Sequence, residues 1–154
     1  MIRVANILGN RTDPSLATQL RDLNGRGLLD VVRLAGDDVF RHRLRVTSEG
    51  GRDIAISLAR GEHIYDGAVL CFEPDFAVVA EVDAARWLRI TPTSKADGLL
   101  IGHQAGHLHW KVRFDGEDLL VLLETPMQEY VDRLRVHLDD SHFAVTEMSE
   151  VPCA

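Results

Sequence analysis

The sequence predicts an α+β protein built from two domains, and three observations support this prediction. The first half of the 154-residue chain alternates apolar and polar residues between closely spaced glycine turns. Residues 72–75, Phe-Glu-Pro-Asp, then interrupt the apolar pattern. Beyond them, strand-like and helix-like periodicities follow one another. We therefore expect an N-terminal all-β domain over residues 1–74, a mixed domain over residues 75–147, and a short C-terminal tail over residues 148–154.

The clearest predicted element of the N-terminal domain is a β-hairpin. Alternation over residues 39–46 and again over 54–58 predicts two strands, and residues 48–51 supply the turn between them. Further glycine turns follow at short intervals, and we expect residues 21–27 to form a loop in this domain. The first strand places three arginines on one face: Arg41, Arg43 and Arg45. We interpret them as a solvated strand face, with binding of an acidic partner as the alternative.

The second domain is predicted to begin with two strands and a helix. Residues 77–82 and 87–91 have the apolar, β-branched character of strands. Ser94 is the expected N-cap of a helix that begins near Lys95 and runs toward Gly106.

A hairpin, a second helix and a strand complete the predicted domain. Residues 111–114 and 119–123 are expected to be strands on either side of the Asp-Gly turn at 115–116. Thr125 is the expected N-cap of the second helix, and residues 142–146 form the last strand. This helix carries an apolar stripe: Met127, Tyr130, Val131, Leu134 and Leu138. The order strand, helix, strand, strand, helix, strand predicts a ferredoxin-like domain.

Composition excludes several classes of function. A formal net charge of −7 argues against nucleic-acid binding, which depends on cations that neutralise phosphates. Cys71 and Cys153 are the only two cysteines, so neither a disulfide framework nor a cysteine zinc site is expected. No apolar run approaches the length of a membrane span, and the first residues do not resemble a signal peptide. The sequence therefore predicts a cytoplasmic protein that contacts no membrane.

Three of the seven histidines fall within residues 102–110, and imidazole is a good ligand for nickel, copper and zinc. If the helix continues through this segment, His103 and His107 lie one turn apart on one face. If the chain is extended there, His107 and His109 share a face instead. Either geometry leaves too few ligands from one chain, so water or a second protomer would complete the shell. The structural alternative is that these histidines only bond nearby carbonyls.

The sequence contains no recognisable catalytic motif. It has no His-Glu-x-x-His helix, no Gly-x-Ser-x-Gly elbow and no glycine-rich phosphate loop that ends in Lys-Ser or Lys-Thr. Carboxylates such as Asp115, Glu117 and Asp118 lie in a predicted hairpin turn, where solvated loop charges are the simpler interpretation. We therefore expect a protein that is not an enzyme.

Two blocks of sequence carry a resemblance to a known family over nearly the whole chain. In the first, residues 43–54, 58–61 and 66–70 resemble a β domain in which a leucine-proline-arginine-glycine turn precedes an aspartate-glycine turn. In the second, residues 102–110 resemble a leucine-glycine-asparagine-x-histidine motif whose last histidine corresponds to His109. Both blocks are similar to those of the urease accessory protein UreE family, which also divides into a β domain and a ferredoxin-like domain.

The resemblance implies a cytoplasmic nickel metallochaperone that delivers Ni(II) during assembly of the urease active site. It implies a homodimer in which His109 is the principal nickel ligand at the interface, with His103 and His107 as further candidates. His107 stands where the family motif has asparagine, so it is either an added ligand or a polar substitute. The implied partners are the urease apoprotein and other urease accessory proteins, including a GTPase. The alternatives are a zinc or copper carrier and a scaffold or adaptor whose histidines are structural.

Overall fold

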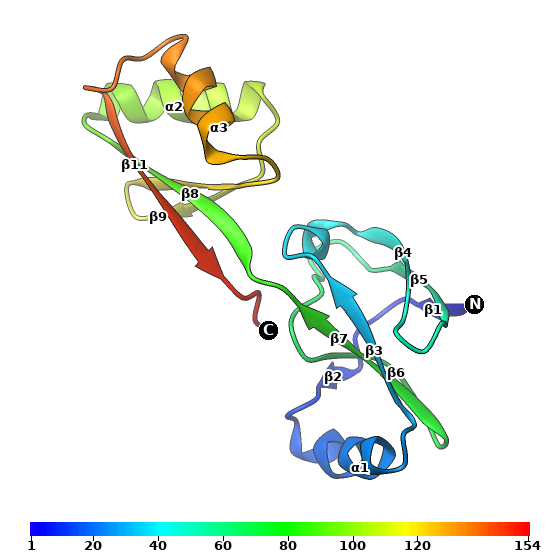
Figure 1. Cartoon of the computed structure of the whole chain (residues 1–154). Helices are drawn as coiled ribbons and strands as arrows, with labels where there is room; N and C mark the ends of the chain where they lie inside the picture. Colours follow the sequence, from blue (N-terminus) through cyan, green and yellow to red (C-terminus); the bar gives the residue numbers. More distant parts are fainter. The chain divides into compact units, whose positions relative to one another are not determined.

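The structure is a computed structural model that describes the whole chain, residues 1–154. It shows an α+β protein with eleven β-strands, three α-helices and one 3-10 helix. The chain forms two compact units (Figure 1): Met1–Ala84 with Val151–Ala154, and Ala85–Glu150. None of the helices is both long enough and apolar enough to cross a membrane.

A three-stranded sheet in the order β1-β5-β4 forms one part of the first unit. β1 spans Ile2–Val4, β4 spans Arg43–Thr47 and β5 spans Asp53–Ser57. β4 and β5 form the antiparallel hairpin that the alternation of residues predicts, and β1 pairs with β5 in parallel. A short 3-10 helix, η1 at Asp38–Phe40, replaces the start of the predicted first strand.

A second sheet of the first unit has four strands in the order β2-β6-β7-β3. Their bounds are Gly9–Asn10 for β2, Leu29–Leu34 for β3, Ala68–Glu73 for β6 and Phe76–Val82 for β7. Because β7 pairs with both β6 and β3, the first unit extends to Ala84, whereas the sequence pattern placed the boundary at residue 74. Both sheets contribute to one apolar core, which includes Ile54 of β5 and Val78 of β7.

The helix α1, Pro14–Gly25, packs against this second sheet (Figure 1). Its buried residues Leu20 and Leu23 belong to the same apolar cluster as Val69 of β6. The prediction of an all-β N-terminal domain with a loop at residues 21–27 is therefore wrong. Packing of the leucine face against the sheet stabilises a helix where turn-like residues suggested a loop.

A buried carboxylate fixes the turn between β4 and β5. Asp30 of β3 is 6% exposed and accepts hydrogen bonds from Ser48 Oγ at 2.6 Å, Gly50 N at 2.8 Å and Arg52 Nη1 at 2.7 Å. Burial alone would raise the pKa of Asp30, but these bonds and one from the Val31 N–H outweigh burial and lower the pKa. A Cβ at Gly50 would lie 2.7 Å from Asp30 Oδ2, so the turn requires glycine there.

The second unit follows the predicted order of strand, helix, strand, strand, helix, strand. Its elements are β8 at Ala85–Pro92, α2 at Lys95–His107, β9 at Val112–Asp115, β10 at Asp118–Leu122, α3 at Met127–Arg135 and β11 at Phe143–Glu150. The strands form one antiparallel sheet in the order β11-β8-β10-β9. The predicted tail at 148–154 is divided, because β11 continues to Glu150 and Val151–Ala154 belongs to the first unit.

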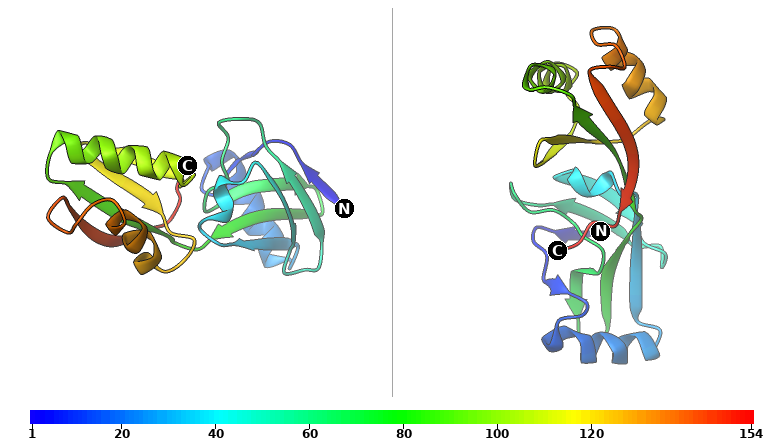
Figure 2. Two further views of the ribbon diagram at one scale, coloured as in Figure 1. Left: turned by 90° about the horizontal axis from the view of Figure 1, so that it is seen from above. Right: turned by 90° about the vertical axis from the view of Figure 1, so that its left-hand side faces the viewer.

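Both helices of the second unit lie on one face of its sheet (Figures 1 and 2). Leu88 and Ile90 of β8 form a common core with Ile101 of α2 and with Val131 and Leu134 of α3. This core holds α2 against β8 and therefore fixes the position of the predicted histidine ligands.

The two helices begin in different ways. Ser94 caps α2 as predicted, because its hydroxyl accepts the N–H of Asp97 at 3.1 Å. The prediction that Thr125 caps α3 is wrong, since the N-cap is Pro126 and no side chain caps this end.

Candidate metal centre

α2 exposes one face that carries two of the predicted ligands. Ile101 and Ala105, one turn apart, are buried in the core of the second unit. His103 and His107 lie on the exposed side of the helix. Their rings are stacked, with centroids 6.4 Å apart and an interplanar angle of 16°. The structure therefore realises the helical alternative, in which these two imidazoles are neighbours on one face.

His109 lies just beyond the end of α2, in the turn that closes the helix. The N–H of His109 donates to the carbonyl of Gly106 at 3.1 Å, and the N–H of Trp110 donates to the carbonyl of Ala105 at 2.9 Å. These two bonds form a Schellman motif with Leu108 as C-cap and His109 as the next residue. The extended alternative, with His107 and His109 on one strand face, is not formed.

The Schellman motif places His109 in the left-handed region of backbone conformation. Its φ is 56°, and it is the only residue other than glycine with a positive φ. This conformation costs an L-residue with a Cβ roughly 1–2 kcal/mol, and glycine commonly occupies the position for that reason. The side chain of His109 is nevertheless exposed and has no bond within the chain that would explain its presence. An uncommon backbone conformation at a residue with an unpaired metal-binding side chain makes His109 a candidate functional residue.

His109 also lines a cavity of about 210 Å³ in the second unit. Trp110 and Tyr130 form one wall, with ring centroids 5.1 Å apart, and Tyr130 Oη accepts the N–H of Glu124 at 3.0 Å. Lys111 Nζ and Glu124 Oε1 form an ion pair at 2.8 Å. The remaining lining residues are Leu108, Leu122, Thr125, Glu129 and Arg133. His109 therefore stands beside a mixed pocket of aromatic and charged side chains.

The three predicted ligands are brought together only in part. His103 and His107 are neighbours, whereas His109 follows the helix end in a different backbone conformation. The chain has no group of three or more histidine, cysteine, aspartate or glutamate side chains placed to hold one metal ion. A complete coordination shell around His109 would therefore need water or ligands from another molecule.

Sequence reasoning missed the strained backbone of His109 and the cavity beside it. The usual signal for a left-handed helix end is glycine, and a histidine at this position gives no such signal. The aromatic wall was partly detectable, since Tyr130 lies on the predicted apolar stripe of the second helix, which must pack near the end of the first.

Comparison with known proteins identifies the N-terminal part of the chain. Residues 4–83 match the family described as UreE urease accessory protein, N-terminal domain. This match covers the greater part of the first unit.

Whole-chain relatives extend this match through the second unit. Urease accessory protein UreE 1 of Pseudomonas syringae pv. syringae (strain B728a) is 39% identical over 140 residues, which are 91% of this chain and 96% of that protein. The protein of the same name from Pseudomonas syringae pv. tomato (strain DC3000) is 38% identical over the same shares. Urease accessory protein UreE of Natronomonas pharaonis is 31% identical over 92% of this chain and 68% of its own length. The chain thus belongs to the urease accessory protein UreE family.

Proposed function

We propose that this chain is a metallochaperone that binds Ni(II) through His109 and delivers it during assembly of the urease active site. The observation that carries the proposal is the left-handed backbone of His109, at a position where glycine would be less strained. The imidazole is exposed and beside a cavity, so an ion bound there could be reached by a partner. The membership of the family supports an accessory role in urease assembly, without catalysis by this chain.

The proposed cargo site suits a carrier because its shell is incomplete. A chaperone must hold an ion long enough to keep it from other sites and must then release it. One imidazole from a chain, supplemented by exchangeable ligands, provides such a balance better than a closed cage. His103 and His107 are neighbouring imidazoles on the exposed side of α2 that would serve as further ligands.

A homodimer would complete the site with a second copy of His109 across a twofold axis. Exposed apolar residues on the same unit support an interface: Leu99 is 77% exposed and Phe114 is 76% exposed. Leu99 lies one helical turn before His103 on the exposed face of α2. An interface that covers this face would place histidines of both copies close together.

We assign the two units different tasks. The second unit, with two helices on one face of an antiparallel sheet in the order β11-β8-β10-β9, is interpreted as the ferredoxin-like domain that binds metal and dimerises. The first unit is proposed to dock to the urease apoprotein or to other urease accessory proteins, including a GTPase.

Calorimetric nickel titration of the wild-type chain and of His109→Gly tests the proposal, with light scattering on the same samples to report the assembly state. We expect about one tightly bound nickel ion per dimer, lost in His109→Gly while the dimer remains. His137→Ala, which removes an exposed histidine between α3 and β11, is the matched control and should retain the tight site.

Other outcomes of this titration select the alternatives. Unchanged binding in His109→Gly would remove His109 from the site, and no binding by the wild-type chain would favour a scaffold that carries no metal. Competition with zinc and copper identifies the cargo, because imidazole ligands alone do not discriminate among these ions. Displacement of nickel by stoichiometric zinc at equal concentration would contradict a nickel carrier.

A further inference from the structure

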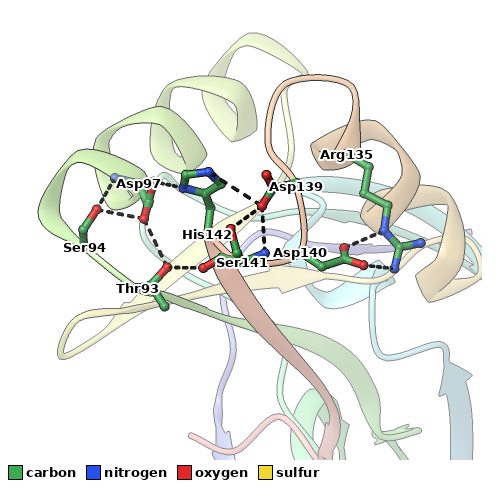
Figure 3. Close-up of polar contacts among 8 residues, drawn as sticks. All are labelled: Thr93, Ser94, Asp97, Arg135, Asp139, Asp140, Ser141 and His142. Atoms are coloured by element: carbon green, nitrogen blue, oxygen red, sulfur yellow. Dashed lines mark hydrogen bonds and ion pairs between the residues drawn. The ribbon is translucent and has the colours of Figure 1, made fainter.

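The loop before β11 holds a histidine between two carboxylates that come from different elements (Figure 3). His142 Nδ1 is 2.8 Å from Asp97 Oδ1, and His142 Nε2 is 3.7 Å from Asp139 Oδ1. Asp97 belongs to the first turn of α2, whereas Asp139 belongs to the segment between α3 and β11. The His142 side chain is 43% exposed, so its outer nitrogen can be reached from solvent.

Asp97 fixes the orientation of the imidazole from the inner side. Its side chain is only 9% exposed, and it accepts hydrogen bonds from Ser94 Oγ at 2.8 Å and from Thr93 Oγ1 at 3.1 Å. The bond from Ser94 lowers the pKa of Asp97 against the effect of desolvation, and bonds from His142 and Thr93 add to this. An ionised carboxylate accepts only, so the proton on His142 Nδ1 is the donor in this pair.

The outer nitrogen of His142 then faces a second acceptor. In a neutral imidazole with the proton on Nδ1, Nε2 carries a lone pair. Asp139 Oδ1 is held toward it by the backbone N–H of Ser141 at 2.9 Å and by the Ser141 hydroxyl. Two acceptors that face each other at 3.7 Å repel unless a cation or a proton lies between them.

We propose that His142 Nε2 and Asp139 Oδ1 form a second metal site, which takes a divalent ion of the nickel, copper and zinc group. For an ion placed 2.0–2.2 Å from each atom, the angle at the ion between its two bonds would be about 125°. A small shift of the Asp139 side chain would bring this angle to the tetrahedral value. Asp97 is the positioning residue, in the arrangement of carboxylate, histidine and metal that is typical of such sites. Water completes the shell.

The local charge favours a cation at this place. Arg135, a basic side chain near the loop, forms an ion pair with Asp140 at 2.8 Å rather than with Asp139. The site is distinct from the one proposed at His109, because Asp97 and His107 are separated by about 15 Å along the axis of α2. With two protein ligands and water, its ion can exchange with metal ions in solution.

Ring nitrogen-15 NMR of the full-length protein with Zn(II) as a diamagnetic probe tests this site directly. Before zinc is added, His142 should show the tautomer with the proton on Nδ1, and zinc should shift Nε2 with a saturating isotherm. Asp139→Asn should raise the dissociation constant at His142 at least about tenfold, because a carboxylate ligand is lost. Asp97→Asn should raise it about 10–100-fold and should also change the tautomer, which a merely structural role would not do.

His137→Ala supplies the matched control, since it removes another exposed histidine that lies between α3 and β11. The isotherm at His142 should be unchanged in this variant, and in His109→Gly as well, so the outcome does not depend on the proposed function. Backbone amide spectra verify that each variant is folded. An Nε2 signal that does not move with zinc, or that moves equally in Asp139→Asn, would overturn the proposal.

Discussion

The backbone N–H of Trp110 donates to the carbonyl of Ala105 at 2.9 Å, and this bond turns the chain sharply at the end of α2. The turn carries the indole back toward Tyr130, with ring centroids 5.1 Å apart, in the apolar core that both residues share with Ala105. His109, which directly precedes Trp110, adopts the unfavourable left-handed backbone conformation that this turn requires, with a φ of 56°. Packing of Trp110 and exposure of His109 are thus two results of one helix ending.

The first prediction concerns stability at this turn. His109→Gly should be more stable than His109→Ala by about 1 kcal/mol, because only glycine adopts the left-handed conformation without a clash of Cβ. Urea unfolding followed by tryptophan fluorescence measures the difference, since both tryptophans, Trp87 and Trp110, lie in the second unit.

The same pair of substitutions at His103 is the control for that prediction. His103 lies inside α2, where alanine is favoured over glycine by about 1 kcal/mol. The order of stability should therefore reverse between the two positions. An identical order at both would show that strain at residue 109 contributes nothing to the stability of the second unit.

Local signals were sufficient to predict α2 and the order of elements in the second unit, but not the conformation of His109. The Ser94 cap and the Asp-Gly pair at 115–116 are such signals, and the structure has a helix after the first and a hairpin turn at the second. The left-handed conformation of His109 depends on the packing of Trp110 against the core of the second unit, which is a tertiary effect. A spacing rule applied to three histidines could not reveal it.

A second prediction separates a helix cap that forms from one that does not. Ser94→Ala should lower the unfolding free energy of the second unit by about 1 kcal/mol, because the Asp97 N–H loses its acceptor at the start of α2. Thr125→Ala, at the position that the sequence also suggested as a cap, should change it much less, since α3 has no side-chain cap. Equal losses in the two variants, measured by tryptophan fluorescence in urea, would contradict the cap assignment.

The first unit was predicted less well, and α1 shows why. Leu16, Leu20 and Leu23 have helical spacing, and Pro14 stands at the first helical position. Gly25 and Gly27, at the C-terminal end of this segment, suggested a loop instead, and the segment contains few apolar residues. Packing against the sheet stabilises the helix where its own sequence does not, because Leu20 and Leu23 are buried there.

A third prediction concerns the carboxylate that fixes the turn between β4 and β5. Asp30→Asn should lower the stability of the first unit by about 1–3 kcal/mol, because the buried hydroxyl of Ser48 and the half-buried guanidinium of Arg52 lose a charged acceptor. Amide hydrogen exchange along β3 measures the opening free energy in this unit. Asp53→Asn, which breaks an exposed pair with Arg45, is the matched control and should have a smaller effect.

The fourth prediction is the pH dependence that the same residue imposes. The folded-state pKa of Asp30 is lower than its ordinary value of 3.8, so the contribution of Asp30 to stability is fully present above that value. It is lost as the pH falls below 3.8 and through the lower folded pKa, because Asp30 must then be protonated. Asparagine does not titrate, so the gap in unfolding free energy between wild type and Asp30→Asn should narrow over this acidic range. Urea titrations followed by circular dichroism from neutral to acidic pH measure the gap, and a gap that stays constant would show that Asp30 is not held ionised by its hydrogen bonds.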